Sequence, residues 1–379
     1  QARMLVRDKQ TTNPVVVALP KGVRSRWRFL WERWTIFWHL HFKRHNLFAI
    51  DVANTGADIT SLREFKQADV IHLSWINQGM LSLSTIRKIV NSGKPVVWTM
   101  HDIWPATAIC HLTLGCNNFK QQCRRCKYLP GGGGDNDLST KVWNKKKRIY
   151  EKSDIHFVAC SRWLADQARQ SQLLRGHHVF AIPNPIDTRM FAPKNKIESA
   201  ERMNLPTNKR LILFAAQRAT NANKGLAYLI EACNLLAAQY PDMKDNTALV
   251  VLGGKANQAV AELPFPTIPV RNPSLSGAPS FRFTMPCTHL FCHRFPRTFP
   301  TPLWRLWPAV CPASAFMWAA SPKRSTTRKT AMWRAIAMQP TWHKASDGCC
   351  ARPIMPNLAR KRCAKCWPIT RNRPLPFNI

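Results

Sequence analysis

The sequence predicts an α/β protein with two doubly wound parallel sheets. Short apolar segments of strand length alternate with longer segments of helical periodicity from residue 68 to residue 254, and this alternation is typical of βαβ units. A chain of 379 residues that is 45% hydrophobic can fill two cores. The alternation is interrupted over residues 190–208, so we expect one Rossmann-like sheet on each side of that interval.

The elements of the first unit follow from their patterns in order. An apolar strand, ADVIHL, precedes a helix that Gly93 ends, and Pro95 then leads into a second strand. A further helix, strand and helix complete the doubly wound pattern before the corner IPNPID. The expected strands are residues 68–73, 96–100, 155–160 and 178–182, and the expected helices are residues 83–90, 140–151 and a segment after Ser161.

The second unit opens with the strand RLILFAA at Arg210, continues as a helix over residues 224–239, and returns as the strand TALVVLGG. We therefore expect an N-terminal domain over residues 1–195, the start of a second domain over 205–265, and an irregular tail over 271–379 that leaves this domain incomplete. The segment ARMLV looks like the second strand of its domain, so we expect a truncated start.

The tail differs in composition from the rest. Residues 271–379 hold 18 Lys and Arg, one acid (Asp347), 15 Pro and two Gly. Proline at this density disfavours helices and central strands, yet the segment has too many tryptophans for a disordered linker. Two explanations stay open: a basic nucleic-acid arm that stacks bases on tryptophan, or translation in the wrong reading frame.

The net charge and the cysteine content limit the classes of protein to which the chain can belong. The formal charge is +36, which is typical of proteins that meet nucleic acid or an anionic membrane. No run of 18 apolar residues and no signal peptide are present, so we expect a cytoplasmic protein.

In the cytoplasm, free thiols or metal ligands are favoured over disulfides as the state of cysteine side chains. Four cysteines share one loop with His111, and they indicate either structural zinc or reduced thiols: Cys110, Cys116, Cys123 and Cys126.

A tryptophan stripe points to a surface. Trp27, Trp31, Trp34 and Trp38 recur at gaps of four, three and four, which places them on one face of a helix. Basic residues accompany them, namely Arg24, Arg26, Arg28, Arg33, Lys43 and Arg44. This composition suits a helix lying on anionic lipid at the inner face of the cytoplasmic membrane. Packing against the helix's own domain is the alternative.

Over roughly residues 1–265 the chain resembles bacterial retaining GT-B glycosyltransferases of the group 1, family four kind. The resemblance is carried by ADVIHLSWIN, TMHDIWP, IPNPIDTRMF and QRATNANKG, in the family's order and spacing. It implies that His101 lies beside the transferred sugar, and that Arg218 and Lys224 hold the donor's phosphates at a helix N-terminus. Asp102, Asn184 and Asp187 are expected near a cleft between the domains, and catalysis is expected to need no metal.

The same resemblance bears on the tail. If the last base of each codon is read with the first two bases of the next codon, the codons of residues 292–323 permit the amino-acid sequence SENLPNTIMEAMACG. In the family, the two glutamates of this sequence bind the nucleotide sugar. At three positions the shifted codon is fully known, and the residue that it encodes fits the family's sequence. Trp307–Pro308 forces Ala, Met317–Trp318 forces Val, and Trp318–Ala319 forces Gly. We therefore favour a frameshift that begins between residues 265 and 285.

The resemblance implies transfer of a sugar from a nucleotide sugar to a glycan or lipid-linked acceptor in envelope polysaccharide synthesis. Because the two glutamates are absent in this frame, weak or no activity is expected. The alternatives are a nucleic-acid-binding protein that uses the tail, although no specific nucleic-acid motif supports it, and a noncatalytic sugar-binding remnant stabilised by zinc.

Overall fold

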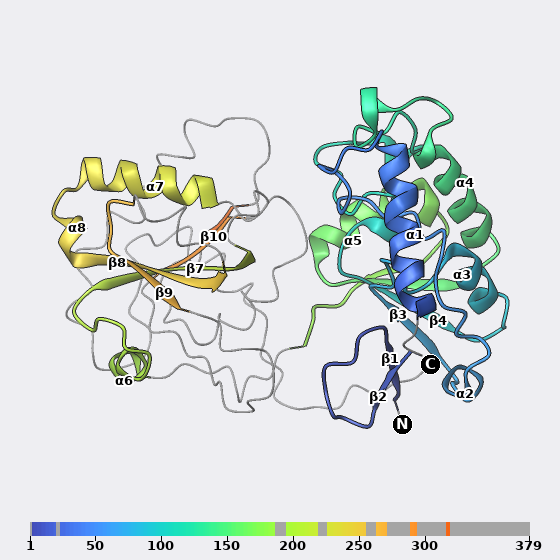
Figure 1. Ribbon diagram of the computed structural model, residues 1–379, viewed down its shortest axis with the longest axis horizontal. Coiled ribbons are helices and arrows are strands. Elements are labelled where there is room, and N and C mark those ends of the chain that lie inside the picture. The colour runs from blue at the N-terminus through green and yellow to red at the C-terminus, as the bar shows by residue number, and fades with distance from the viewer. Residues whose placement is uncertain are drawn as a thin grey trace, which may run out of the picture. The chain divides into compact units, whose positions relative to one another are not determined.

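The computed structural model describes residues 2–19, 23–185, 195–218, 226–254, 263–270, 289–293 and 316–318. The chain divides into two compact units, residues 1–323 and 324–379, and every described residue belongs to the first. Figure 1 shows two larger parallel sheets with helices packed beside each of them. The predicted α/β class with Rossmann-like sheets is therefore confirmed.

The first sheet has four parallel strands in the order β3-β4-β5-β6. Each expected strand is present, although the ends differ by up to three residues. The strands are β3 (Ile71–Ser74), β4 (Val96–Met100), β5 (Ile155–Ala159) and β6 (Val179–Ala181). The helices of this part are α1 (Val23–His39), α2 (Arg63–Lys66), α3 (Leu83–Val90), α4 (Leu138–Tyr150) and α5 (Arg162–Arg169).

Side-chain caps explain where these helices begin. The Ser82 hydroxyl accepts a hydrogen bond from the Thr85 amide at the start of α3, as the Asp137 carboxylate does from Thr140 at the start of α4. Such caps satisfy amide groups that have no partner inside the helix. The cap at Asp137 starts α4 at Leu138, two residues before the expected position.

The N-terminal segment differs from the expectation. Strand β1 (Met4–Val6), within ARMLV, pairs in parallel with β2 (Val16–Ala18) in a separate two-stranded sheet. Among the described strands, β1 pairs with β2 and has no pairing with the four-stranded sheet, and its place as the second strand of its domain stays a prediction. The pattern of a short apolar strand does not specify its pairing partner, because hydrogen bonds of the backbone are the same for every sequence.

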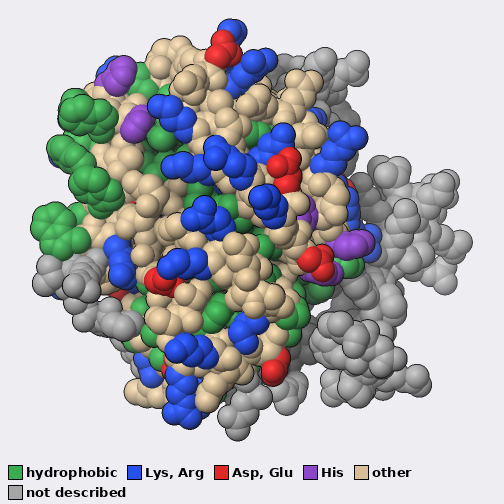
Figure 2. Space-filling view, turned by 90° about the vertical axis from the view of Figure 1, so that its right-hand side faces the viewer, with side chains coloured by type: hydrophobic (Ala, Val, Ile, Leu, Met, Phe, Trp, Pro, Cys, Tyr) green, Lys and Arg blue, Asp and Glu red, His purple; other side chains and the backbone are tan. Residues whose placement is uncertain are grey.

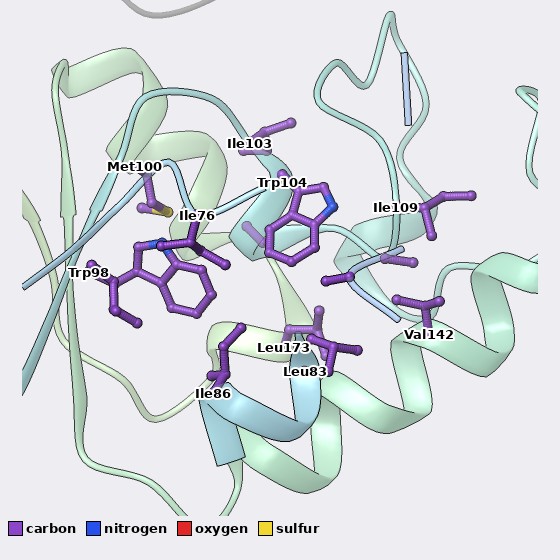
Figure 3. Close-up of a cluster of buried hydrophobic side chains, with 14 of the residues drawn as sticks. Ile76, Leu83, Ile86, Trp98, Met100, Ile103, Trp104, Ile109, Val142 and Leu173 are labelled. Atoms are coloured by element: carbon purple, nitrogen blue, oxygen red, sulfur yellow. The ribbon is translucent and has the colours of Figure 1, made fainter. Parts of the chain in front are cut away.

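The core of the first domain is rich in aromatic side chains. Trp98 on β4 stacks on Phe157 of β5 with ring centroids 5.9 Å apart, and Trp104 lies 6.2 Å from Trp98. Figure 3 shows these two indoles among aliphatic side chains that include Ile76 of the loop after β3 and Ile86 of α3. This packing fixes β4, and with it the residues that follow β4 at the edge of the sheet.

The second sheet has five parallel strands in the order β11-β10-β7-β8-β9. Leu211 and Leu213 of β7 pack with Val250 of β8 and with Ala200 of α6. The strands are β7 (Arg210–Arg218), β8 (Thr247–Gly254), β9 (Thr267–Val270), β10 (His289–His293) and β11 (Phe316–Trp318), and the helices are α6 (Lys196–Arg202), α7 (Leu226–Gln239) and α8 (Met243–Asn246). Strands β10 and β11 come from the predicted irregular tail, so these two short segments add to the sheet.

None of the helices in the described ranges has the length and apolar character needed to cross a membrane.

Candidate active site

His101 follows β4 directly and stands at the carboxyl edge of the first sheet. Its Nε2 atom shares a 3.0 Å hydrogen bond with the hydroxyl of Ser74, the last residue of the neighbouring strand β3. Ligands of open α/β sheets bind at this edge, because loops there are free of the sheet's own pairing. The predicted position of His101 is thus the one that the fold provides, and Ser74 is a neighbour that sequence reasoning missed.

The surroundings of His101 keep its imidazole neutral. Partial burial lowers the pKa of His101, the nearby charge of Asp102 opposes this shift, and His72 adds to it. Because the pKa falls below the ordinary value of 6.5, the ring is uncharged at neutral pH. A neutral imidazole at this edge is able to donate or accept a hydrogen bond at a sugar hydroxyl.

The carboxylate of Asp102 is hydrogen-bonded to other residues of the first domain. One oxygen, Oδ1, accepts a 2.9 Å hydrogen bond from the Trp104 amide, and Oδ2 lies 2.8 Å from Nδ1 of His111. These contacts fix the turn that follows His101. Asp102 therefore has the geometry of a residue that positions its neighbour, whereas sequence reasoning placed it in the cleft without separating the two roles.

A buried chain of charged groups continues from Asp102. His111 Nε2 lies 2.6 Å from Oδ2 of Asp51, and the other oxygen of Asp51 accepts a hydrogen bond from the Arg33 guanidinium. Burial by itself lowers the pKa of His111, but Asp102 and Asp51 outweigh it and raise the pKa to about 9. His111 is therefore a charged link between two carboxylates at neutral pH.

The series of charged side chains that begins at Asp102 ends on helix α1. Arg33 and its neighbour Glu32 are both buried, and Glu32 Oε1 accepts hydrogen bonds from the amides of Val52 and Ala53. Burial, and then the charge of Asp51, raise the pKa of Glu32, while Arg33 and the two amides oppose the shift. Arg33 is one of the basic residues that accompany the tryptophan stripe in the sequence, but its side chain pairs inward with Asp51 and is buried.

A buried lysine supports the same region. The Lys146 ammonium donates hydrogen bonds to the carbonyls of Trp104 and Thr107, at 2.7 and 2.9 Å, and lies 3.2 Å from the centre of the Trp104 ring. Burial lowers the pKa of Lys146 well below its usual range, although the charges of Asp102 and Asp51 oppose the shift. Lys146 thereby ties α4 to the segment after β4.

The four loop cysteines are free thiols, and Cys110 is the buried one. Burial raises the pKa of Cys110 to about 12 and that of Cys126 to about 11, so these thiols are protonated at neutral pH. Within the described residues, no group of three or more His, Cys, Asp or Glu side chains is arranged to hold a metal ion. The geometry thus does not provide a closed zinc site, and binding of zinc stays a prediction.

The remaining predicted residues divide between the two sheets. Asn184 follows β6 and is half-buried, so it belongs to the same carboxyl edge as His101, with β5 between their strands. Arg218 is the last residue of β7, where its backbone pairs with Gly254 of β8. Asp187 and Lys224 lie outside the described residues.

The two parallel α/β sheets, with His101 at the carboxyl edge of the first of them, place the protein in the GT-B fold class. Solved structures share this fold: trehalose-6-phosphate synthase OtsA has a TM-score of 0.53 at 10% identity, covering 88% of this chain and 82% of that chain. A UDP-forming α,α-trehalose-phosphate synthase from Burkholderia xenovorans has a TM-score of 0.51 at 12% identity, covering 88% and 84%.

Residues 15–190 match the family model of Glycosyltransferase Family 4. A curated relative, the putative colanic acid biosynthesis glycosyl transferase WcaC of Escherichia coli K12, is 36% identical over 63 residues. That match spans 16% of this chain and 15% of the relative. The family predicted from the motifs is confirmed for the matched residues.

Proposed function

We propose that the chain is a glycosyltransferase of the retaining, hexose-transferring type, which moves a sugar from a nucleotide donor to a hydroxyl of a glycan or lipid-linked acceptor. The observation that carries the proposal is the neutral His101, hydrogen-bonded to Ser74 at the carboxyl edge of a family four domain. The Escherichia coli relative is named for colanic acid biosynthesis, and this supports an acceptor in envelope polysaccharide synthesis. The name of the Burkholderia xenovorans neighbour, a UDP-forming synthase, supports UDP as the nucleotide.

In this proposal the charges that develop during transfer determine the roles of the residues. Cleavage of the sugar–phosphate bond places negative charge on the departing diphosphate, which Arg218 and Lys224 stabilise as cations. His101 donates a hydrogen bond to a hydroxyl of the transferred sugar, and Ser74 holds the ring in place. The acceptor hydroxyl attacks the anomeric carbon from the face that the diphosphate leaves and gives its proton to an oxygen of the departing diphosphate, so the configuration at the anomeric carbon is retained.

The chain in its present reading frame lacks the two glutamates of the donor site, so we expect weak or no turnover. A one-base insertion between codons 265 and 285 restores the alternative frame and with it SENLPNTIMEAMACG. Both proteins are incubated with radiolabelled UDP-sugars and GDP-sugars and a bacterial lipid extract as acceptor. Transfer by the restored protein, lost when both restored glutamates are changed to glutamine, supports the proposal.

No transfer by the restored protein with any donor, together with no binding of UDP or GDP in a calorimetric titration, contradicts the proposed function. The metal content of the purified chain is measured in the same preparation. One equivalent of zinc supports a structural site at the four cysteines, and its absence removes the zinc-stabilised alternative.

A further inference from the structure

The outer face of α1 exposes a row of tryptophans to solvent. Trp27, Trp31, Trp34 and Trp38 are 62%, 57%, 51% and 59% exposed. Figure 2 shows large hydrophobic side chains protruding along the edge of the molecule where α1 of Figure 1 lies. We name this face the α1 aromatic surface, and it comprises Trp27, Leu30, Trp31, Trp34, Trp38 and Phe42. Apolar surface of this extent marks an interaction site, because water solvates it poorly.

Part of this surface is ordered by its own ring contacts. Phe42 meets Trp38 edge to face with centroids 5.3 Å apart, and Trp34 at 6.4 Å. Phe37 joins the cluster, 5.4 Å from Phe42. A partner therefore meets rings that are already held in place, and it pays little conformational entropy for fixing them.

The opposite face of α1 fastens the helix to its domain. Ile36 and Leu40 are fully buried, and Glu32 and Arg33 form the inner end of the charged chain described above. Gly79 approaches the backbone of α1 so closely that a Cβ atom there would lie 2.9 Å from the Phe29 nitrogen. The tryptophans therefore cannot rotate inward without breaking these contacts.

The charge beside the α1 aromatic surface is positive. Arg26, Lys43 and Arg44 are exposed, and Glu32, the single acid in residues 25–50, is buried. A bilayer with anionic headgroups complements these cations, and tryptophan is favoured at the boundary between headgroups and acyl chains. A second copy of the chain brings the same cations to the contact, so like charges oppose pairing of two such surfaces.

We propose that the α1 aromatic surface docks the protein on an anionic lipid bilayer. The helix lies in the plane of the interface, the indoles enter the boundary of the acyl chains, and the basic side chains contact the headgroups. The link to the proposed function is a lipid-linked acceptor, but docking needs neither donor nor turnover. Vesicle binding without substrates therefore tests this inference separately from the enzymatic one.

The test is co-flotation of the full chain with vesicles of phosphatidylethanolamine that do or do not contain phosphatidylglycerol. Wild type is expected to float with the anionic vesicles. The double variant Trp31→Ser with Trp34→Ser is expected to lose binding by about tenfold or more, because two large apolar side chains no longer enter the lipid. The matched control, Ile197→Ser with Tyr240→Ser, changes two exposed apolar residues elsewhere and is expected to float like wild type.

A second pair of variants tests the charge. Lys43→Gln with Arg44→Gln is expected to weaken flotation and to reduce its sensitivity to salt, whereas Lys141→Gln with Lys145→Gln on α4 leaves both unchanged. The proposal is overturned if the double variant Trp31→Ser with Trp34→Ser floats with the anionic vesicles as well as wild type does. So does a wild type that fails to float but sediments as a dimer, with dimerisation lost in that variant, since the surface then binds a second copy.

Discussion

The carboxylate of Asp102 and the imidazole of His111 are joined by a hydrogen bond of 2.8 Å. Asp102 follows the candidate catalytic residue His101 in sequence, while the second nitrogen of His111 is bound to Asp51, 2.6 Å away. A series of charged side chains inside the domain thus holds the turn that follows His101.

Replacement of His111 by alanine removes the cation between two buried carboxylates. We expect a loss of about 3–5 kcal/mol in the free energy of unfolding, because Asp102 then lacks its charged partner and Asp51 keeps only Arg33. Urea unfolding followed by circular dichroism measures it. Lys88→Ala, which removes an exposed pair with Asp58, is the control and changes stability by at most about 1 kcal/mol. Equal effects of the two variants contradict the role of His111.

Stability is expected to fall at alkaline pH through the same histidine. The folded-state pKa of His111 is about 9, above the ordinary value of 6.5, so its contribution is complete below pH 6.5 and is lost as pH rises through 9. The contribution is about 3 kcal/mol. Urea unfolding between pH 6 and 10 is compared for wild type and His111→Asn. The difference between the two proteins shrinks as pH rises, and a constant difference refutes the raised pKa.

His101→Ala is expected to lower kcat of the frame-restored protein by about 10²–10³-fold, since a hydrogen bond to the reacting sugar is lost. Because His101 is only half-buried, its removal leaves the melting temperature within a few degrees. Ser74→Ala, which removes only the partner of the ring, is expected to have a smaller effect. The acid limb of the wild-type pH–rate profile lies below pH 6.5, because the pKa of His101 is lowered. An unchanged kcat in His101→Ala excludes the catalytic role.

Arg218→Ala and Lys224→Ala are expected to weaken binding of UDP or GDP, because each removes a charge-assisted contact worth about 1.5–3 kcal/mol with phosphate. Isothermal titration of the frame-restored protein measures the affinity. Lys244→Ala, an exposed cation on α8, is the control and binds like wild type. If Arg218→Ala and Lys224→Ala bind the nucleotide as tightly as the control Lys244→Ala, the two cations do not hold the diphosphate.

The encoding DNA is expected to show a missing base, or two extra bases, between codons 265 and 285 when it is compared with intact relatives. The reason is that the shifted frame reads SENLPNTIMEAMACG across residues 292–323. Resequencing of the locus and of close homologous loci checks it. Homologues that carry the basic tail in this frame support the nucleic-acid alternative, whose own test is salt-dependent binding to single strands that deletion of residues 271–379 abolishes.

Much of the first sheet could be predicted because its signals are local. The segment LSTIRKIV and the strand VVWTM carry their own periodicity, and both occur with the expected bounds at Leu83–Val90 and Val96–Met100. His101 could be placed at a sheet edge for the same reason, since it follows a strand directly. The strand ARMLV has an equally clear pattern, but its partner β2 could not be inferred from it.

The sequence by itself indicated the strands of the first sheet, the strands β7 and β8, the longer helices, the family motifs and the change in composition after residue 270, because each is a property of neighbouring residues. Only the tertiary structure decided that Asp51, Asp102 and His111 meet, across up to 60 positions of the chain. It also decided which way α1 faces: its periodicity fits either orientation, and the buried pairing of Arg33 with Asp51 leaves the tryptophans in solvent. Contacts of this kind depend on chain folding, which no local pattern records.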